Sequence, residues 1–175
     1  QDWADEAGLL AAKTEVYNSI MLFQDYILDV DPEKGQAANM GTDEYQELHE
    51  YVLPQLKTYV SELGYADLLI IDDYGRVLFS IKKNEELGQD LQHGPLSSSP
   101  LGQVWAKTME VEAAFGDFRP HAGHEDAIIG YVGAPIHDHN GVVAGSAVLA
   151  LPGDKIRAIL DSTSEHGLQG QYKVM

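Results

Sequence analysis

The sequence contains no cysteine. This excludes disulfide bonds, thiol nucleophiles, iron–sulfur clusters and covalently attached haem, although it selects no cellular compartment. Basic residues are also scarce: 11 Lys and Arg stand against 28 Asp and Glu, which gives a net charge of −17. Such a chain repels nucleic-acid phosphates and anionic lipid headgroups, so nucleic-acid binding is not expected. A run of about 18 apolar residues, as a membrane-spanning helix requires, is missing as well.

The length of 175 residues, with 44% apolar residues, suits the core of one ordinary domain. The chain begins with Gln1 and stops at Met175 inside a plausible strand. We expect both ends to be cuts beside membrane helices that lie outside this sequence.

The first part of the chain predicts a helix between Asp5 and Asp29. From Val16 to Val30 its apolar residues are spaced 4, 3, 4 and 3 positions apart. This narrow apolar seam, with Lys13 at one of its positions, predicts packing against another helix. That helix could belong to the same domain or to a second copy of the chain in a parallel homodimer.

A second helix is predicted from Asp43 to about Leu63. Thr42 is suited to begin it and Gly64 to end it. Pro54 lies inside this segment and removes one backbone hydrogen bond, so the helix is expected to kink or to break in two there.

The stretch from Ala66 to Lys83 predicts a β-hairpin. Two apolar runs, Leu68 to Ile71 and Val77 to Ile81, flank the turn sequence Asp72-Asp73-Tyr74-Gly75-Arg76. Alternation along the second strand predicts that one face of the sheet carries the side chains of Val77, Phe79, Ile81 and Lys83.

The rest of the chain predicts three more strands and two short helices. An ordered loop covers residues 84–100, and a short helix with Trp105 covers 101–109. Strands are expected over 110–118, 127–136 and 142–151, and a last helix over 155–162. Together these segments predict an α+β fold of the PAS-like kind, with an antiparallel sheet of about five strands and a long N-terminal helical region.

The hairpin sequence resembles the opening of the Cache sensor modules of bacterial chemoreceptors. Other positions match that family in chain order, and the set covers roughly residues 43 to 170. They are Lys83, Gly88 and Leu91, then Gly94, Pro95, Ser99 and Leu101, then Asp117-Phe118, then Ala134-Pro135-Ile136, Gly141, Gly145, Leu151-Pro152 and Asp154-Lys155-Ile156.

The resemblance implies the extracytoplasmic Cache sensor domain of a methyl-accepting chemotaxis protein, anchored in the cell inner membrane with this domain in the periplasm. Residues 1–63 would form the N-terminal helical region and residues 64–163 the Cache module. Residues 164–175 would lead to a membrane helix or to a second module. The receptor would be a homodimer and would signal through its helices. Histidine kinases and cyclases also carry such modules, so they remain alternatives.

The ligand pocket is expected between the sheet and the connection formed by residues 84–109. A pocket with aromatic walls, one cation and one anion suits a small polar metabolite, either an organic acid or an amino-acid-like molecule. The expected ligand-binding residues are Phe79, Lys83, Trp105, Asp117, Arg119, His121 and Tyr131. Alternatively, Arg119 forms a surface ion pair with Asp117 or Glu125. The loop after Phe118 departs from the family pattern, so no individual ligand follows from the resemblance.

Other chemistries are less well supported by the sequence. The two histidine-containing groups, residues 121–126 and 137–139, lie at the ends of a ten-residue strand about 33 Å long, so they are not expected to bind one metal ion. No metal site, cofactor or catalytic residue is therefore expected, although a metal- or cofactor-binding module remains an alternative. Adjacent acids such as Glu85 and Glu86 point apart, and no phosphate-binding loop is present, so the chain is not expected to be an enzyme.

Overall fold

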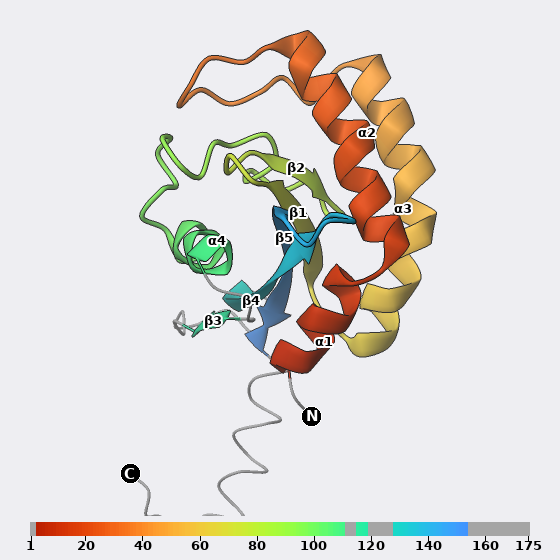
Figure 1. Ribbon diagram of the computed structural model, residues 1–175, viewed down its shortest axis with the longest axis vertical. Coiled ribbons are helices and arrows are strands. Elements are labelled where there is room, and N and C mark those ends of the chain that lie inside the picture. Colours follow the sequence, from red (N-terminus) through yellow and green to blue (C-terminus); the bar gives the residue numbers. More distant parts are fainter. Residues whose placement is uncertain (1–2, 111–114, 119–127, 154–175) are drawn as a thin grey trace, which may run out of the picture.

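The computed structural model describes residues 3–110, 115–118 and 128–153. The elements are α1 (Trp3–Ala11), α2 (Thr14–Val30), α3 (Asp43–Leu63), β1 (Asp67–Asp72), β2 (Val77–Ser80), α4 (Pro100–Glu110), β3 (Phe115–Phe118), β4 (Ile128–His137) and β5 (Val143–Pro152). Helices α1, α2 and α3 lie on one side of the sheet and α4 lies on the other (Figure 1). We refer to these two sides as the helical face and the α4 face.

The sheet has five strands in the order β2-β1-β5-β4-β3, and every neighbouring pair is antiparallel. The predicted α+β fold with about five antiparallel strands is therefore confirmed. The central strands β1 and β5 are almost wholly buried because both faces of the sheet are covered. Within the described residues, the predicted hairpin, the helix at 101–109 and the last two strands lie where the sequence placed them.

The first predicted helix is in fact two helices, which meet at Lys13. This residue has an extended backbone, with φ −74° and ψ 138°, so α1 ends at Ala11 and α2 begins at Thr14. Lys13 therefore does not belong to a continuous apolar seam. Its ammonium group lies over the ring of Tyr59 in α3, 4.3 Å from the ring centroid.

The apolar seam of α2 packs on the sheet of its own domain. Val16, Ile20 and Phe23 are 0% exposed and belong to the core between the helices and the helical face. The prediction that this seam joins two subunits is wrong, because a 4-3 spacing shows only that one side of the helix is buried. The contact is close: a Cβ added to Gly145 of β5 would lie 2.9 Å from Cδ1 of Ile20.

Helix α3 has the predicted bounds. The hydroxyl oxygen of Thr42 accepts a hydrogen bond from the Tyr45 amide at 3.1 Å, and Gly64 ends the helix with a φ of 80°. The helix continues through Pro54 without a break. Its inner side reaches the edge strand, since the Tyr45 hydroxyl donates to the Leu78 carbonyl at 2.7 Å.

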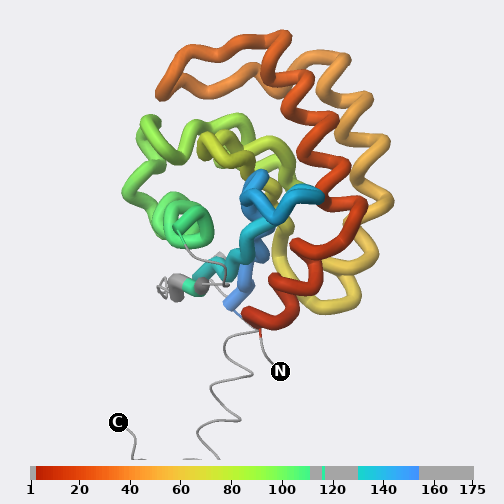
Figure 2. The backbone as a smooth tube through the Cα atoms, viewed as in Figure 1, coloured from red at the N-terminus to blue at the C-terminus, as the bar shows by residue number. Residues whose placement is uncertain are grey.

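The loop between α2 and α3, residues 31–42, is fastened to the loop of residues 84–99. The carboxylate of Asp90 accepts a hydrogen bond from the Gly35 amide at 2.8 Å, and the Ala38 amide donates to the Gly88 carbonyl at 2.9 Å. The guanidinium group of Arg76, 8% exposed, donates to the carbonyls of Gln36 and Gly88. We refer to residues 31–42 as the strap; it runs above the 84–99 loop in Figure 2.

Some predicted segments lie outside the described residues. They are the helix expected at 155–162, the connector at 164–175, and residues 111–114 of the strand expected at 110–118. The remainder of that strand is β3. No helix in the part of the chain that the structure describes combines the length and apolarity needed to cross a membrane.

Candidate functional site

A row of paired residues crosses four strands of the sheet. Asp67 of β1 is paired with Ala150 of β5, Ala150 with Tyr131 of β4, and Tyr131 with Asp117 of β3. Ala150 belongs to the cluster that packs under α4, and Tyr131 packs against the same cluster. Because directly paired residues share a face, Asp67, Ala150 and Tyr131 lie on the α4 face. The small Ala150 thus separates an acidic position from a phenol.

Asp67 is 0% exposed, and its carboxylate is bound by the second strand of the hairpin. Oδ1 accepts hydrogen bonds from the amides of Leu68 at 2.8 Å and Ile81 at 2.9 Å, and Oδ2 accepts one from the Ser80 hydroxyl at 2.7 Å. Burial raises the pKa of Asp67, and these hydrogen bonds act in the opposite direction. Asp67 therefore holds the end of β2 against β1 and leaves a buried acidic group beside the row.

Tyr131 is partly buried on the α4 face. We refer to Tyr131 and the three acids whose charges act on it, Glu85, Glu86 and Asp67, as the acidic corner. Burial raises the pKa of its phenol, and the negative charges of Glu86, Asp67 and Glu85 raise it further. Burial also raises the pKa of Glu86, with repulsion from Asp67 and Glu85 as additional causes. The phenol therefore remains a hydrogen-bond donor or acceptor at neutral pH. The negative charges that act on it favour a ligand group with positive charge.

Trp105 of α4 packs on the α4 face of the sheet. Its indole Nε1 donates to the Asp72 carbonyl at 2.9 Å, and the side chain is 6% exposed in the cluster with Leu69 and Val104. The polar tip of the indole is thus satisfied by the β1–β2 turn. Trp105 fixes α4 on the sheet and does not offer its N–H to a pocket.

Phe79 and Lys83 are not part of the α4 face, so their predicted place in the pocket is wrong. Phe79 is 0% exposed on the helical face, with its ring centroid 5.7 Å from that of Phe23 and 4.8 Å from that of His49. The Lys83 ammonium donates to the Gln46 side chain of α3.

A β-bulge explains why the alternation failed. Val77 is paired with Ile71 and Phe79 with Ile70, so Leu78 is an extra residue in β2. Val77 consequently packs under α4, whereas Phe79 packs against α2 and α3.

Asp117, Arg119 and His121 were also predicted to bind the ligand. Asp117 occupies the expected strand and is paired directly with Tyr131. Arg119 and His121 lie outside the described residues, so their roles stay predictions. Among the described residues, no group of three or more His, Asp or Glu side chains is arranged to hold a metal ion.

The sequence analysis missed Asp67 and Glu86 as parts of this site. An acidic residue directly before a buried apolar strand was a usable signal for Asp67, because a buried acid requires hydrogen-bond donors around it. Glu86 carried no comparable signal, since its place beside Tyr131 arises from the path of the 84–99 loop.

Comparisons of the fold point to sensor domains. The V. cholerae histidine kinase DctB sensor domain matches with a TM-score of 0.59 and 13% identity, over 89% of this chain and 50% of that one. The chain thus spans half the length of the DctB domain. The E. coli DcuS sensor domain matches with a TM-score of 0.50 and 14% identity, over 90% of both chains. No protein-family model and no curated protein matches the sequence. The chain therefore shares the PAS-like fold that the resemblance implied with these two sensor domains.

Proposed function

We propose that this chain is the extracytoplasmic ligand-sensing domain of a membrane-anchored signal-transduction receptor, a chemoreceptor in the first instance, and is not an enzyme. It binds a small polar metabolite on the α4 face. The observation that carries the proposal is the acidic corner around Tyr131, on a fold shared with two sensor domains. The sensor domain of a histidine kinase is the second candidate, because one of the two similar folds belongs to such a kinase.

The acidic corner favours an amino-acid-like ligand over a simple organic acid. The negative charges of Glu86, Asp67 and Glu85 act on the phenol of Tyr131, so an ammonium group beside it would replace repulsion by attraction. Arg119, if it reaches this face as the sequence predicts, would bind the carboxylate of the same ligand. Together with Asp117, it completes the pair of opposite charges that an amino acid requires.

The strap provides a path from this face to the helices. A ligand that shifts the 84–99 loop would act on Asp90 and Gly88, which are bonded to Gly35 and Ala38 of the strap. Because the strap joins α2 to α3, its displacement would change how these helices pack. We place the signalling step there, between the 84–99 loop and the paired helices α2 and α3.

The intact receptor is proposed to be a homodimer, with the contact on the outer side of α2 and α3. Met21, Leu28 and Tyr51 are large apolar side chains that are 49%, 76% and 67% exposed there. Membrane anchors would raise the effective concentration of two copies. Sedimentation should show weak self-association of the isolated chain that Leu28→Glu abolishes. A tight dimer that survives this substitution would place the interface elsewhere.

A thermal-shift screen tests the ligand proposal directly. Amino acids, amines, organic acids and divalent metals are added one at a time, and the melting temperature is measured. An amine-bearing metabolite should raise it, and Glu86→Gln or Tyr131→Phe should reduce that rise. Loss of one hydrogen bond to a charged group corresponds to about 1.5–3 kcal/mol, or roughly 10- to 100-fold in Kd.

The control is Glu47→Gln, because Glu47 is an exposed acid on α3, away from the α4 face. It removes the same charge and should leave the ligand-induced shift unchanged. Ala substitutions of Asp117 and Arg119 should abolish the shift if both bind the ligand. A shift that persists in all four site variants would refute the placement of the ligand on the α4 face.

A further inference from the structure

A cavity lies on the opposite side of the sheet from the acidic corner. Its volume is about 510 Å³, and it is bounded by α1, the beginning of α2, and β4 with the β4–β5 turn. This volume falls in the range of small-molecule sites. No residue of the acidic corner lines it, so it is separate from the site proposed above.

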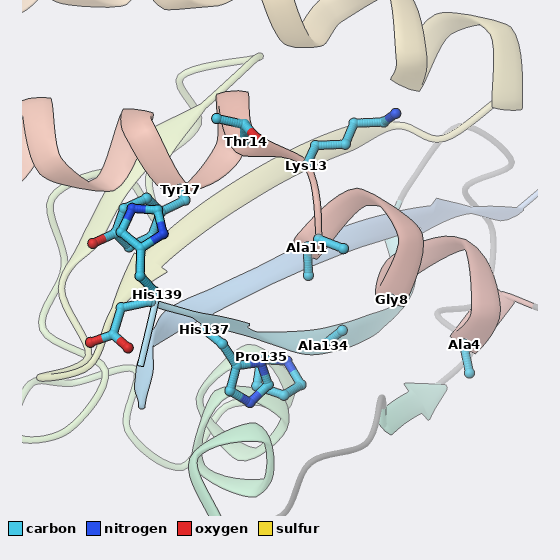
Figure 3. A pocket seen from close by; sticks show the side chains of 12 residues that line it. Ala4, Gly8, Ala11, Lys13, Thr14, Tyr17, Ala134, Pro135, His137 and His139 are labelled. Atoms are coloured by element: carbon cyan, nitrogen blue, oxygen red, sulfur yellow. The ribbon is translucent and has the colours of Figure 1, made fainter. Parts of the chain in front are cut away.

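The long walls of the cavity are made of small apolar residues. Ala4, Gly8 and Ala11 of α1 face Ala134 of β4 (Figure 3). A Cβ added to Gly8 would have no atom within 4 Å, so the wall of α1 stands clear of its neighbours at this point. The space between these walls can accept a flat apolar group.

One end of the cavity is aromatic and polar. The rings of Tyr17 and His139 meet edge to face there, with centroids 5.3 Å apart, and overlap in the view of Figure 3. An edge-to-face pair presents both a ring surface and ring edges to a further aromatic ring. The imidazole of His139 and the hydroxyl of Tyr17 add hydrogen-bonding groups at the same end.

The polar groups at this end suit a negatively charged ligand group. The exposed Thr14 begins α2, and the residue before it, Lys13, provides no side-chain cap for the first turn. Asp138 is the one acid in the lining, and its Oδ1 already accepts hydrogen bonds from the amides of Asn140 and Val142, at 2.8 and 2.9 Å. The amides of Val16 and Tyr17 donate to the Lys13 carbonyl at 3.1 and 3.3 Å, so the donors offered to a carboxylate are the first-turn amides of Thr14 and Glu15 and the Thr14 hydroxyl. The carboxylate of Glu15 in this turn accepts a hydrogen bond from the Tyr59 hydroxyl of α3 at 3.4 Å.

We propose that this cavity binds a small aromatic carboxylate. The ring lies between α1 and β4 and against the Tyr17–His139 pair, and the carboxylate lies at Thr14 and the first turn of α2. The ligand thus contacts both helices beside Lys13, where α1 and α2 meet, and it fixes the angle between them. It acts as a second input to the helices, independent of the metabolite on the α4 face.

Benzoate is the probe, and titration calorimetry of the 175-residue chain measures its binding. Benzylamine and benzyl alcohol have the same ring with a cationic and a neutral head, so benzoate should bind at least about tenfold more tightly than either. Gly8→Phe places a large side chain in the open space and should weaken benzoate binding at least about tenfold. His139→Ala removes the exposed ring of the Tyr17–His139 pair and should weaken benzoate binding without disturbing the core.

Gly8→Ala is the matched control, since its single methyl group enters open space and should leave benzoate binding nearly unchanged. Glu86→Gln should leave it unchanged too, whatever its effect on the metabolite of the α4 face. Benzylamine binding as tightly as benzoate would overturn the carboxylate assignment. If neither Gly8→Phe nor His139→Ala weakens benzoate binding, the site itself is overturned. The same holds if the wild type shows no saturable binding up to about 10 mM benzoate.

Discussion

Replacing Asp72 by Asn should change how the stability of this domain depends on pH. Asp72 ends β1 and is 3% exposed. Its Oδ1 accepts the amides of Tyr74 and Arg76, both at 2.9 Å, and thereby shapes the hairpin turn. An Asn side-chain oxygen can accept the same two hydrogen bonds, so Asp72→Asn removes the charge and keeps the geometry of the turn.

The size of this change in stability follows from the pKa of Asp72. Burial raises this pKa from 3.8 to about 6, although the hydrogen bonds from Arg76 and Tyr74 act to lower it. A carboxyl group with a higher pKa in the folded state binds more protons folded than unfolded, so acid favours folding. The stability that this group contributes is complete below pH 3.8 and is lost as the pH rises to about 6. At 1.36 kcal/mol per pKa unit, the loss is on the order of 3 kcal/mol.

Urea unfolding between pH 4 and pH 8 measures this difference. The free energy of unfolding of the wild type should fall relative to that of Asp72→Asn as the pH rises to about 7, and then run parallel to it. Glu47→Gln, which removes an exposed charge of the same sign, serves as control and should show no such divergence. A wild type that gains stability relative to Asp72→Asn over this pH range would refute the reasoning.

Substitutions at three further positions test the packing. Phe23→Glu should unfold the domain, because the ring of Phe23 is fully buried. Phe23→Ala should lower the free energy of unfolding in urea by about 3–5 kcal/mol. A Phe23→Glu chain that stays folded as a monomer would instead support the contact between two subunits. Asp90→Ala removes the bond to the Gly35 amide and should loosen this end of the strap and speed proteolysis there, although the Ala38–Gly88 bond remains. Cleavage at the wild-type rate would show that the Gly35 bond is dispensable. Gly133→Ala places a Cβ 2.9 Å from Cγ1 of Val104 and should lower the melting temperature by displacing α4; an unchanged value would show that α4 adjusts freely.

Local patterns determined most of the fold. The helix over Asp43–Leu63 was predicted from a capping threonine and a terminal glycine, and both act as predicted. The hairpin was predicted from two apolar runs around an acidic, glycine-containing turn, where Gly75 adopts a φ of 96°. These signals lie within a few residues of the structure that they specify, so no distant contact is needed to interpret them.

Tertiary structure decided which faces these elements share and therefore where the site lies. The bulge at Leu78 sent Phe79 to the helical face, although an unbroken alternation predicted it beside Val77. The seam of α2 showed that Ile20 would be buried, but the sheet and not a second subunit covers it. Periodicity counts positions along one chain segment. The burial partner and the register depend on contacts between segments far apart in the sequence, and these exist only once the chain has folded.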